Sequence, residues 1–243
     1  MKHTIGLAIL VGMAMLALTS CAGLAKNNTA EATDQPYAPV IDPANFISGI
    51  DNPYFPLKPG TVSVFQGETE KGSEHNEVYV TNETKEILGV TCVVVSDTVK
   101  VDGKLEDATL DWYAQDKQGN VWYFGEDSKE YDENGNVSST KGSWEAGVNG
   151  AQPGIIMEAA PKVGDTYRQE YYQGEAEDMA SVLSLSETAS VPSGSYTDVL
   201  MTKEWSALDP AVVEQKYYAR EIGLILVTAG ETERLELVEL RQK

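Results

Sequence analysis

The chain has 243 residues, with 38 acidic side chains against 18 lysines and arginines, and a net charge of −20. So negative a chain repels nucleic acid and anionic lipid headgroups, and we expect neither as a charge-driven partner. Only 2 histidines and 2 cysteines are present, which excludes a metal site built on several histidines and a fold held by several disulfides.

The first twenty residues are typical of a secretory signal. A charged start precedes an apolar run from about Ile5 to Leu18, which is shorter than the roughly 20 residues that a membrane-spanning helix needs. The segment that follows, Leu18-Thr19-Ser20-Cys21, resembles the lipobox of prokaryotic lipoproteins. In that family the chain is cut before the cysteine, whose thiol then receives a diacylglycerol.

This resemblance implies that residues 1–20 are removed and that Cys21 carries the lipid. Residues 21–43 are small, polar and proline-bearing, so we interpret them as a flexible tether. We therefore expect membrane lipid as a partner through Cys21, and a protein anchored in the cell envelope on its periplasmic or surface face. The other cysteine, Cys92, lies in the β-branched run "VTCVVVS", where a buried structural thiol is expected.

Residues 44–243 carry the signals of one β-sheet domain. "NPYFPLKPG" (52–60) contains three prolines, which predicts an extended segment that packs as a lid or an edge. Short runs rich in valine, threonine and aromatic residues follow, separated by turns such as Leu88-Gly89, and this spacing predicts an antiparallel meander. In "TLDWYAQD" the polar residues, Asp111 and Tyr113 among them, alternate with apolar ones, so we expect them on a solvated face.

Short matches recur at an offset of 104 or 105 residues. Gly60 matches Gly164, and "WYA" at Trp112 matches "YYA" at Tyr217. We interpret the matches as an internal duplication of two similar units, at about 58–131 and 162–238, joined by an insert rich in glycine and proline at about 132–161. The predicted fold class is all-β, an antiparallel meander whose two units pack as a sandwich or an open half-barrel.

Catalytic patterns are scarce. The sequence has no nucleophile elbow, no phosphate loop and no dinucleotide fingerprint. His75, the one histidine outside the signal, is expected in an exposed polar turn. "DENGN" from Asp132 lacks the glycine and glutamate that a calcium loop requires at its sixth and twelfth positions, which favours a plain turn. We predict no enzyme, no metal and no cofactor.

The remaining residues favour binding of a ligand. We expect a pocket between the two units, bordered by residues 142–154 and 171–178, that takes a small molecule, a lipid or a glycan. The oligomeric state stays open. The candidate ligand-binding residues are Trp122, Phe124, Trp144, Glu145, Arg168, Tyr171, Glu177 and Asp178.

Two alternative functions remain open. A carboxylate-based hydrolase of the cell envelope would place two carboxyl groups roughly 5–9 Å apart across a cleft. A purely structural envelope protein would have no pocket of useful size.

Several stretches together resemble an uncharacterised family of secreted prokaryotic proteins and lipoproteins, over most of the chain from about Asn52. The stretches are "NPYFPLKPG", "DWYAQDKQGNVWYFGED", "GSWEAGVNGAQPGI" and "GDTYRQEYYQGEAED". The resemblance implies an extracytoplasmic protein but no activity and no catalytic residues. "YYAREIGLILV" is also similar to periplasmic proteins with an open, half-closed barrel, as in the lipoprotein-carrier superfamily. A lipid-handling role drawn from that likeness is fold analogy alone.

Overall fold

The computed structural model describes residues 37–69, 71–230 and 233–243, so the predicted signal, Cys21 and most of the tether lie outside the described residues. The first strands are β1 (Phe46–Ile47), β2 (Thr61–Thr69), β3 (Gly72–Ile87), β4 (Val90–Val101), β5 (Lys104–Asp116), β6 (Val121–Tyr131), β7 (Val137–Ser139) and β8 (Trp144–Glu145). The later strands are β9 (Gln152–Met157), β10 (Thr166–Arg168), β11 (Glu170–Tyr171), β12 (Asp178–Val191), β13 (Gly194–Ser206), β14 (Val213–Ala219), β15 (Gly223–Ala229) and β16 (Glu233–Gln242). A short 3₁₀ turn, Pro43–Asn45, precedes β1, and the described part of the chain has no α-helix.

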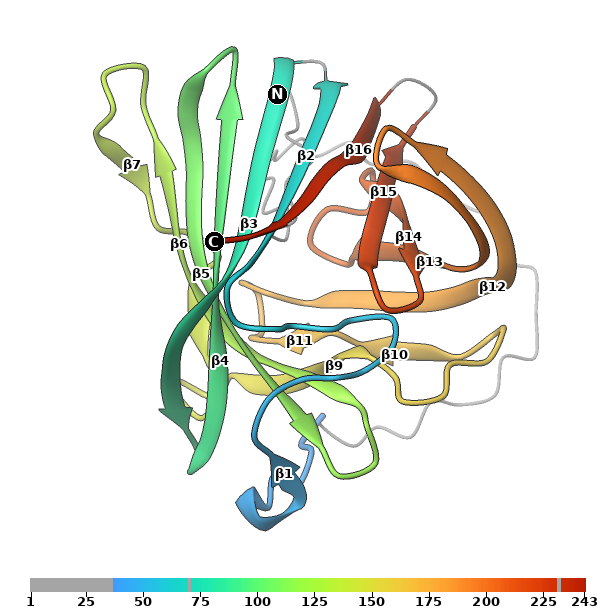
Figure 1. The fold of residues 1–243 in the computed structure, drawn as a ribbon. Coiled ribbons are helices and arrows are strands. Elements are labelled where there is room, and N and C mark those ends of the chain that lie inside the picture. Colours follow the sequence, from blue (N-terminus) through green and yellow to red (C-terminus); the bar gives the residue numbers. More distant parts are fainter. Residues whose placement is uncertain (1–36, 70, 231–232) are drawn as a thin grey trace, which may run out of the picture.

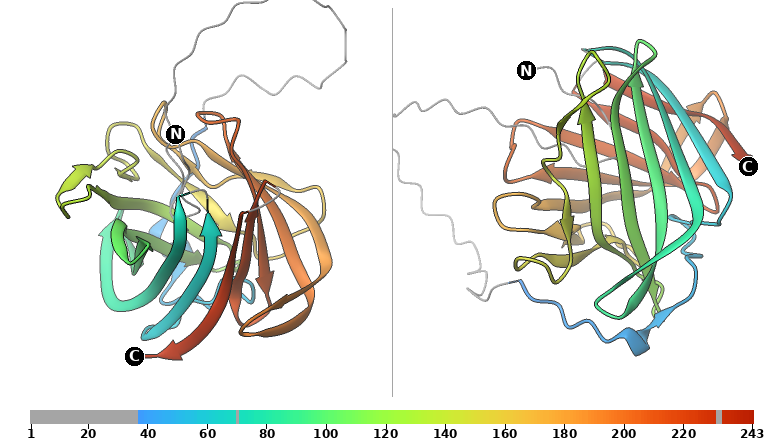
Figure 2. Two further views of the ribbon diagram at one scale, coloured as in Figure 1. Left: turned by 90° about the horizontal axis from the view of Figure 1, so that it is seen from above. Right: turned by 90° about the vertical axis from the view of Figure 1, so that its left-hand side faces the viewer.

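Thirteen strands follow one hydrogen-bonded path, in the order β10-β12-β13-β14-β15-β16-β2-β3-β4-β5-β6-β9-β11. Every pairing is antiparallel, and most neighbours in the sheet are neighbours in the chain. The strands of the two predicted units form two sides of this sheet, cyan to green and orange to red in Figure 1, and they meet where β16 pairs with β2. Viewed from above, the strands curve around a common axis (Figure 2). The all-β antiparallel meander is therefore confirmed, and its sheet curls into a nearly closed barrel.

The two ends of the sheet meet because the chain itself joins them. Strands β10 and β11 lie at opposite ends of the path, yet only Gln169 separates them in the sequence. β10 pairs with β12, and β11 pairs with β9. A glycine at position 154 of β9 permits this approach, since a Cβ there would overlap the backbone of Arg168 and Gln169. We call residues 166–171 the seam.

The two predicted units share local geometry at matching positions. The turns that precede β2 and β10 each contain a glycine of positive φ, 88° at Gly60 and 94° at Gly164. The β5–β6 and β14–β15 hairpins each contain a register shift at a tyrosine, Tyr113 in the first and Tyr218 in the second. These features are consistent with a duplication, which stays a prediction.

The strand register changes one detail of the predicted correspondence between the units. Ala114 pairs with Trp122, and its counterpart Ala219 pairs with Gly223. The segment Trp122-Tyr123-Phe124 thus corresponds to residues 223–225, whereas the fixed offset places it at residues 226–228. The reason is that the second hairpin has a shorter turn than the first.

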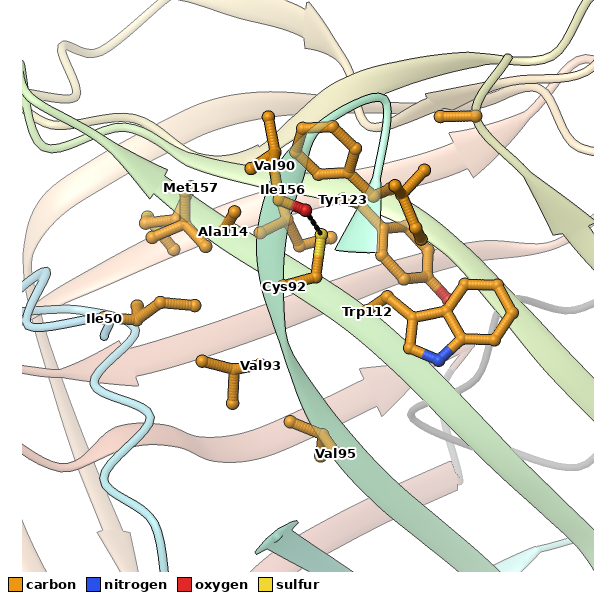
Figure 3. Packing of buried hydrophobic residues seen from close by; sticks show 14 of the residues in the cluster. Ile50, Val90, Cys92, Val93, Val95, Trp112, Ala114, Tyr123, Ile156 and Met157 are labelled. Carbon is orange, nitrogen blue, oxygen red and sulfur yellow. Dashed lines mark hydrogen bonds between the residues drawn. The ribbon is translucent and has the colours of Figure 1, made fainter. Parts of the chain in front are cut away.

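Cys92 lies in the larger apolar core, as expected. Its side chain is 0% exposed and packs among Val90, Ala114 and Trp112, with the thiol donating to the Val90 carbonyl at 3.7 Å (Figure 3). Burial raises the pKa of this thiol to about 12, so it is a packing residue and not a reactive one.

The alternation in β5 is correct, but its polar face points away from water. Thr109, Asp111 and Gln115 are 1%, 4% and 3% exposed, while Leu110 on the opposite face is 37% exposed. The expectation of a solvated polar face is therefore wrong. In a sheet that curls on itself, the inward face of a strand is enclosed by the other strands whatever residues it carries.

No helix in the described ranges has the length and apolar character needed to cross a bilayer.

Candidate functional site

A cavity of about 70 Å³ lies between the proline-rich segment and the interior of the barrel. That volume is enough for several water molecules. Many of the lining side chains are partly exposed, so the cavity reaches solvent. It is lined by Phe55, Pro56, Leu57, Thr61, Ser63, Phe65, Val78, Val80, Val95, Asp97, Asp111, Tyr113, Ile222, Gly223 and Leu224.

The segment from Asn52 to Leu57 covers this cavity, as the prolines led us to expect of a lid. Asn52 is 2% exposed, and its side-chain amide donates to the carbonyls of Gly119 (2.9 Å) and Glu158 (3.1 Å). The backbone N–H of Asn52 donates to Gln115 in β5 at 2.9 Å. These bonds fix the lid against the loops at one end of the barrel. They thereby hold Phe55 and Leu57 over the cavity.

The base of the cavity is polar and buried. Asp97 in β4 and Asp111 in β5 are 2% and 4% exposed, and Tyr113 lies one alternation further along β5. Asn76 donates to Oδ1 of Asp97 at 2.6 Å, and no donor among the described residues bonds its Oδ2. Burial raises the pKa of Asp97 well above its usual range, and the nearby Asp111 carboxylate raises it further.

A tyrosine hydroxyl links Asp111 to a second acid behind the cavity. The Tyr123 hydroxyl lies 2.6 Å from Oδ1 of Asp111 and 3.0 Å from Oε2 of Glu126. A phenol has one proton, so it donates to one carboxyl and accepts from the other, which must itself be protonated. Burial raises the pKa of Asp111 to about 7 and that of Glu126 well above its usual range. Protonation of one of the two acids therefore agrees with the geometry.

Further acids extend from this pair toward the seam. Glu170 in β11 is 0% exposed, and neither carboxyl oxygen makes a hydrogen bond of ordinary geometry with a described residue. Burial raises its pKa well above the usual range, and the carboxylates of Asp178 and Glu126 raise it further, whereas the Trp144 indole N–H beside it lowers it. Such a group is held in the neutral form.

Lys216 in β14 is the one buried lysine or arginine of the described residues. Its ammonium lies 2.8 Å from Glu204 and 3.6 Å from Glu214. Burial lowers the pKa of Lys216, but these two carboxylates raise it by more, so the net shift is upward and the lysine stays charged. The one buried cation is thereby committed to its own acids and does not reach into the cavity under the lid.

A smaller cavity of about 20 Å³ adjoins this ion pair. It has room for one or two water molecules. Its walls are Asp178, Glu204, Trp205, Ser206, Asp209, Val212, Glu214 and Lys216. Because its central acids are already paired with Lys216, we interpret it as part of the internal polar network.

The first two predicted binding residues contact the N-terminal segment. The Trp122 indole N–H donates to Asp116 at 3.0 Å, and Phe124 is 0% exposed. Both rings pack edge-on against Phe46, with centroids 6.3 and 5.6 Å away. Neither lines the two cavities described above.

The predicted pair in the insert is divided between the core and the surface. Trp144 is 4% exposed and packs edge-on against Tyr123, with 5.4 Å between the ring centroids. Glu145 is partly exposed and forms an ion pair with Lys85 at 2.7 Å.

The predicted residues at the start of the second unit lie at or near the seam. Arg168 stacks over the rings of Tyr171 (4.6 Å) and Tyr37 (5.4 Å), and so holds the described end of the tether against the barrel. Glu177 accepts from the backbone of Gly174 at 2.8 Å. Asp178 lines the smaller cavity, and it is the one predicted binding residue that lines either cavity.

Two sequence interpretations of single residues have definite outcomes. His75 lies in strand β3, partly buried and 3.3 Å from Gln66, so its placement in an exposed turn is wrong. The Asp132 carboxylate accepts from the backbone of Asn134 (2.8 Å) and Asn136 (2.9 Å), so this segment forms a turn, as expected, and the absence of calcium there stays a prediction. In the ranges that the structure describes, no group of three or more His, Cys, Asp or Glu side chains is arranged to hold a metal ion.

Sequence reasoning missed the residues around the larger cavity. Asp97 carried a usable signal, since it is an acid within the long β-branched run of β4. Asp111 and Tyr113 were placed correctly on one face of a strand, but nothing local shows that this face turns inward.

Comparisons with known proteins add little. No family model matches the chain, and no curated protein matches it. One solved structure is similar, the crystal structure of a "putative lipoprotein from Parabacteroides distasonis", with 12% sequence identity and a TM-score of 0.41. The alignment covers 77% of this chain and 98% of the other. A likeness this distant carries no statement about the function of this chain.

Proposed function

We propose that this chain is a lipid-anchored, extracytoplasmic binding module without enzymatic activity, and that it takes a small molecule into the cavity under the lid. The observation that carries the proposal is the composition of that cavity. Its walls are mainly apolar, and its polar groups are the buried carboxyls of Asp97 and Asp111, the Tyr113 hydroxyl, and the hydroxyls of Thr61 and Ser63. Small-molecule sites typically combine apolar walls with a few placed polar groups. The anchor is supported by the lipobox at Cys21.

The alternative of a hydrolase has less support. Asp111 and Glu126 come close to each other through the shared Tyr123 hydroxyl, but they are 4% and 3% exposed. A glycan would have to reach both carboxyl groups, and a cavity of about 70 Å³ does not admit a sugar chain. A purely structural protein would not require a solvent-connected cavity with a polar base.

The proposal is tested with a small neutral probe, 3,3,3-trifluoropropan-1-ol. The full chain is held in lipid nanodiscs, with empty nanodiscs as the reference, and binding is followed by broadening of the ¹⁹F signal. We expect broadening with the unmodified chain. In Ser63→Phe the new ring extends from β2 into the cavity, so broadening should fall to the level of the empty nanodiscs.

The matched control is Gln66→Phe, which places the same ring at an exposed position of the same strand. It should bind like the unmodified chain. Thermal unfolding of both variants verifies that they are folded. Equal broadening in the two variants, or none in the unmodified chain, contradicts the proposal.

A further inference from the structure

We infer that the cavity under the lid selects a compact organic cation, a primary ammonium on a short apolar body. The inference rests on the proposed function, because it names the ligand class of the same cavity. It follows from what lines the cavity, what is absent from that lining, and which carboxyl oxygen at the cavity has no donor from the protein.

The lining carries acids without a base. Asp97 and Asp111 come from neighbouring strands, and their side chains lie at the base of one cavity. No lysine or arginine is among the described residues that line it. The nearest candidate from the interior, Lys216, is already paired with Glu204 and Glu214. A cation in direct contact with these two acids therefore has to come from a ligand.

One carboxyl oxygen at the cavity is left free to accept. Asp97 is 2% exposed, its Oδ1 accepts from Asn76 at 2.6 Å, and its Oδ2 has no donor among the described residues. A carboxyl oxygen that lines a cavity without a protein donor can accept a hydrogen bond from a ligand in place of water. An ammonium supplies three N–H donors and a charge at once, and a hydroxyl supplies a single donor without charge.

The pKa shifts of the two acids agree with this reading. Burial raises the pKa of Asp97 well above its usual range and that of Asp111 to about 7, although the charge of Lys216 lowers the pKa of Asp111. An ammonium between them would favour their ionised form. The groups that act on this pair are Glu74, Asp107, Tyr113, Tyr123, Glu126 and Lys216, and only the last is positive.

The walls and the volume set the body of the ligand. Phe55, Leu57, Phe65, Val80 and Leu224 surround the cavity above its polar base. These apolar walls offer no charged partner to a second polar group on the ligand, which disfavours a diamine or an amino acid. The volume of about 70 Å³ limits the enclosed part to a few heavy atoms. A short branched or halogenated alkylamine meets both conditions.

The test compares three probes of one shape in nanodiscs at pH 7.5, again by ¹⁹F NMR. They are 3,3,3-trifluoropropylamine, which is mainly protonated at this pH, the neutral 3,3,3-trifluoropropan-1-ol and the anionic 3,3,3-trifluoropropanoate. We expect the amine to bind roughly tenfold or more tighter than the alcohol, as a charge-assisted hydrogen bond provides, and the anion to bind weakest.

The variant that carries the test is Asp97→Asn with Asp111→Asn, which keeps the shape of both side chains. The preference for the amine over the alcohol should fall to about twofold or less. Thermal unfolding of the double variant verifies that it is folded.

The outcomes separate the two proposals. If the alcohol binds as tightly as the amine, or if the double variant keeps the preference, the cation inference is wrong and the binding function stands. If none of the three probes binds the unmodified chain, the proposed function itself is wrong.

Discussion

At the scale of single residues, the unusual property of this protein is the number of acids that it buries. Asp97, Asp111, Glu126 and Glu170 are each less than 5% exposed. A buried carboxyl group is tolerated when it is neutral or paired, and burial raises the pKa of all four. Buried carboxyl groups with raised pKa values hold protons that they would lose in the unfolded chain. The free energy of unfolding of the protein must therefore depend on pH.

The pH dependence has a definite sign. Asp111 has a pKa of about 7 in the folded protein, against roughly 3.9 in an unfolded chain. Between these values the folded state binds more protons than the unfolded state, so the free energy of unfolding falls as pH rises from about 4 to about 7. We expect Asp111→Asn to flatten this slope between pH 5 and 7, by up to about 1.4 kcal/mol per pH unit. Urea unfolding at pH 5, 6 and 7 measures it.

The control for this prediction is Glu133→Gln, which removes an exposed acid from the turn between β6 and β7. It should keep the slope of the unmodified chain. A free energy of unfolding that rises with pH in this range would contradict the assignment of a raised pKa to Asp111. A slope that Asp111→Asn leaves unchanged would contradict it as well.

At the scale of elements, the hairpins follow from local chemistry and the seam does not. Leu88-Gly89 and Asp102-Gly103 both have positive φ at each residue, which gives the two-residue turns that the sequence predicted. The seam depends on the approach of β9 to the segment between β10 and β11. That approach is possible because residue 154 has no side chain.

We predict that Gly154→Val destabilises the protein by about 3 kcal/mol, because the side chain would overlap the backbone of Arg168 and Gln169. Urea unfolding followed by tryptophan fluorescence gives the free-energy change. Gly135→Ala is the control, since a Cβ there meets no atom within 4 Å and only the positive φ of 79° is strained. It should lose about 1 kcal/mol, the cost of a left-handed conformation for a residue with a Cβ. Equal losses in the two variants would show that the seam does not depend on this contact.

At the scale of the whole molecule, the predicted anchor and the folded domain make separate contributions. The domain holds the cavity, and Cys21 would hold the domain at the membrane through a stretch of chain that ends where Tyr37 packs against Arg168. Stable attachment requires more than one acyl chain, which a diacylated cysteine supplies.

We expect Cys21→Ala to move the protein from the membrane fraction to the soluble fraction of its host, measured by fractionation and immunoblotting. The control is Cys92→Ala, which removes the other cysteine from the buried core of the domain. It should remain with the membrane even if its folding is weakened. Retention of Cys21→Ala in the membrane fraction would overturn the lipobox assignment.

The candidate site shows how far local patterns extend. The aromatic and acidic residues singled out along the chain, Trp144 and Arg168 among them, have their contacts within the core or at the seam. Asp97 and Asp111 form the base of the cavity, although they are far less prominent in the sequence. Prominence along a chain reflects composition, whereas a cavity is formed by residues that distant strands bring together.

Alternation, turn residues and prolines were enough to predict the antiparallel strands, the hairpins and an extended segment over residues 52–60 that packs as a lid or an edge, because each depends on backbone preferences of a few neighbouring residues. The inward direction of Asp111 required the sheet to close, which depends on Gly154 and the seam, about forty to sixty residues further along the chain. A period of two assigns residues to two faces of a strand and does not state which face meets water. The curvature of the complete sheet decides which face of the strand is enclosed. It thereby also decides where the cavity lies and which charged residues line it.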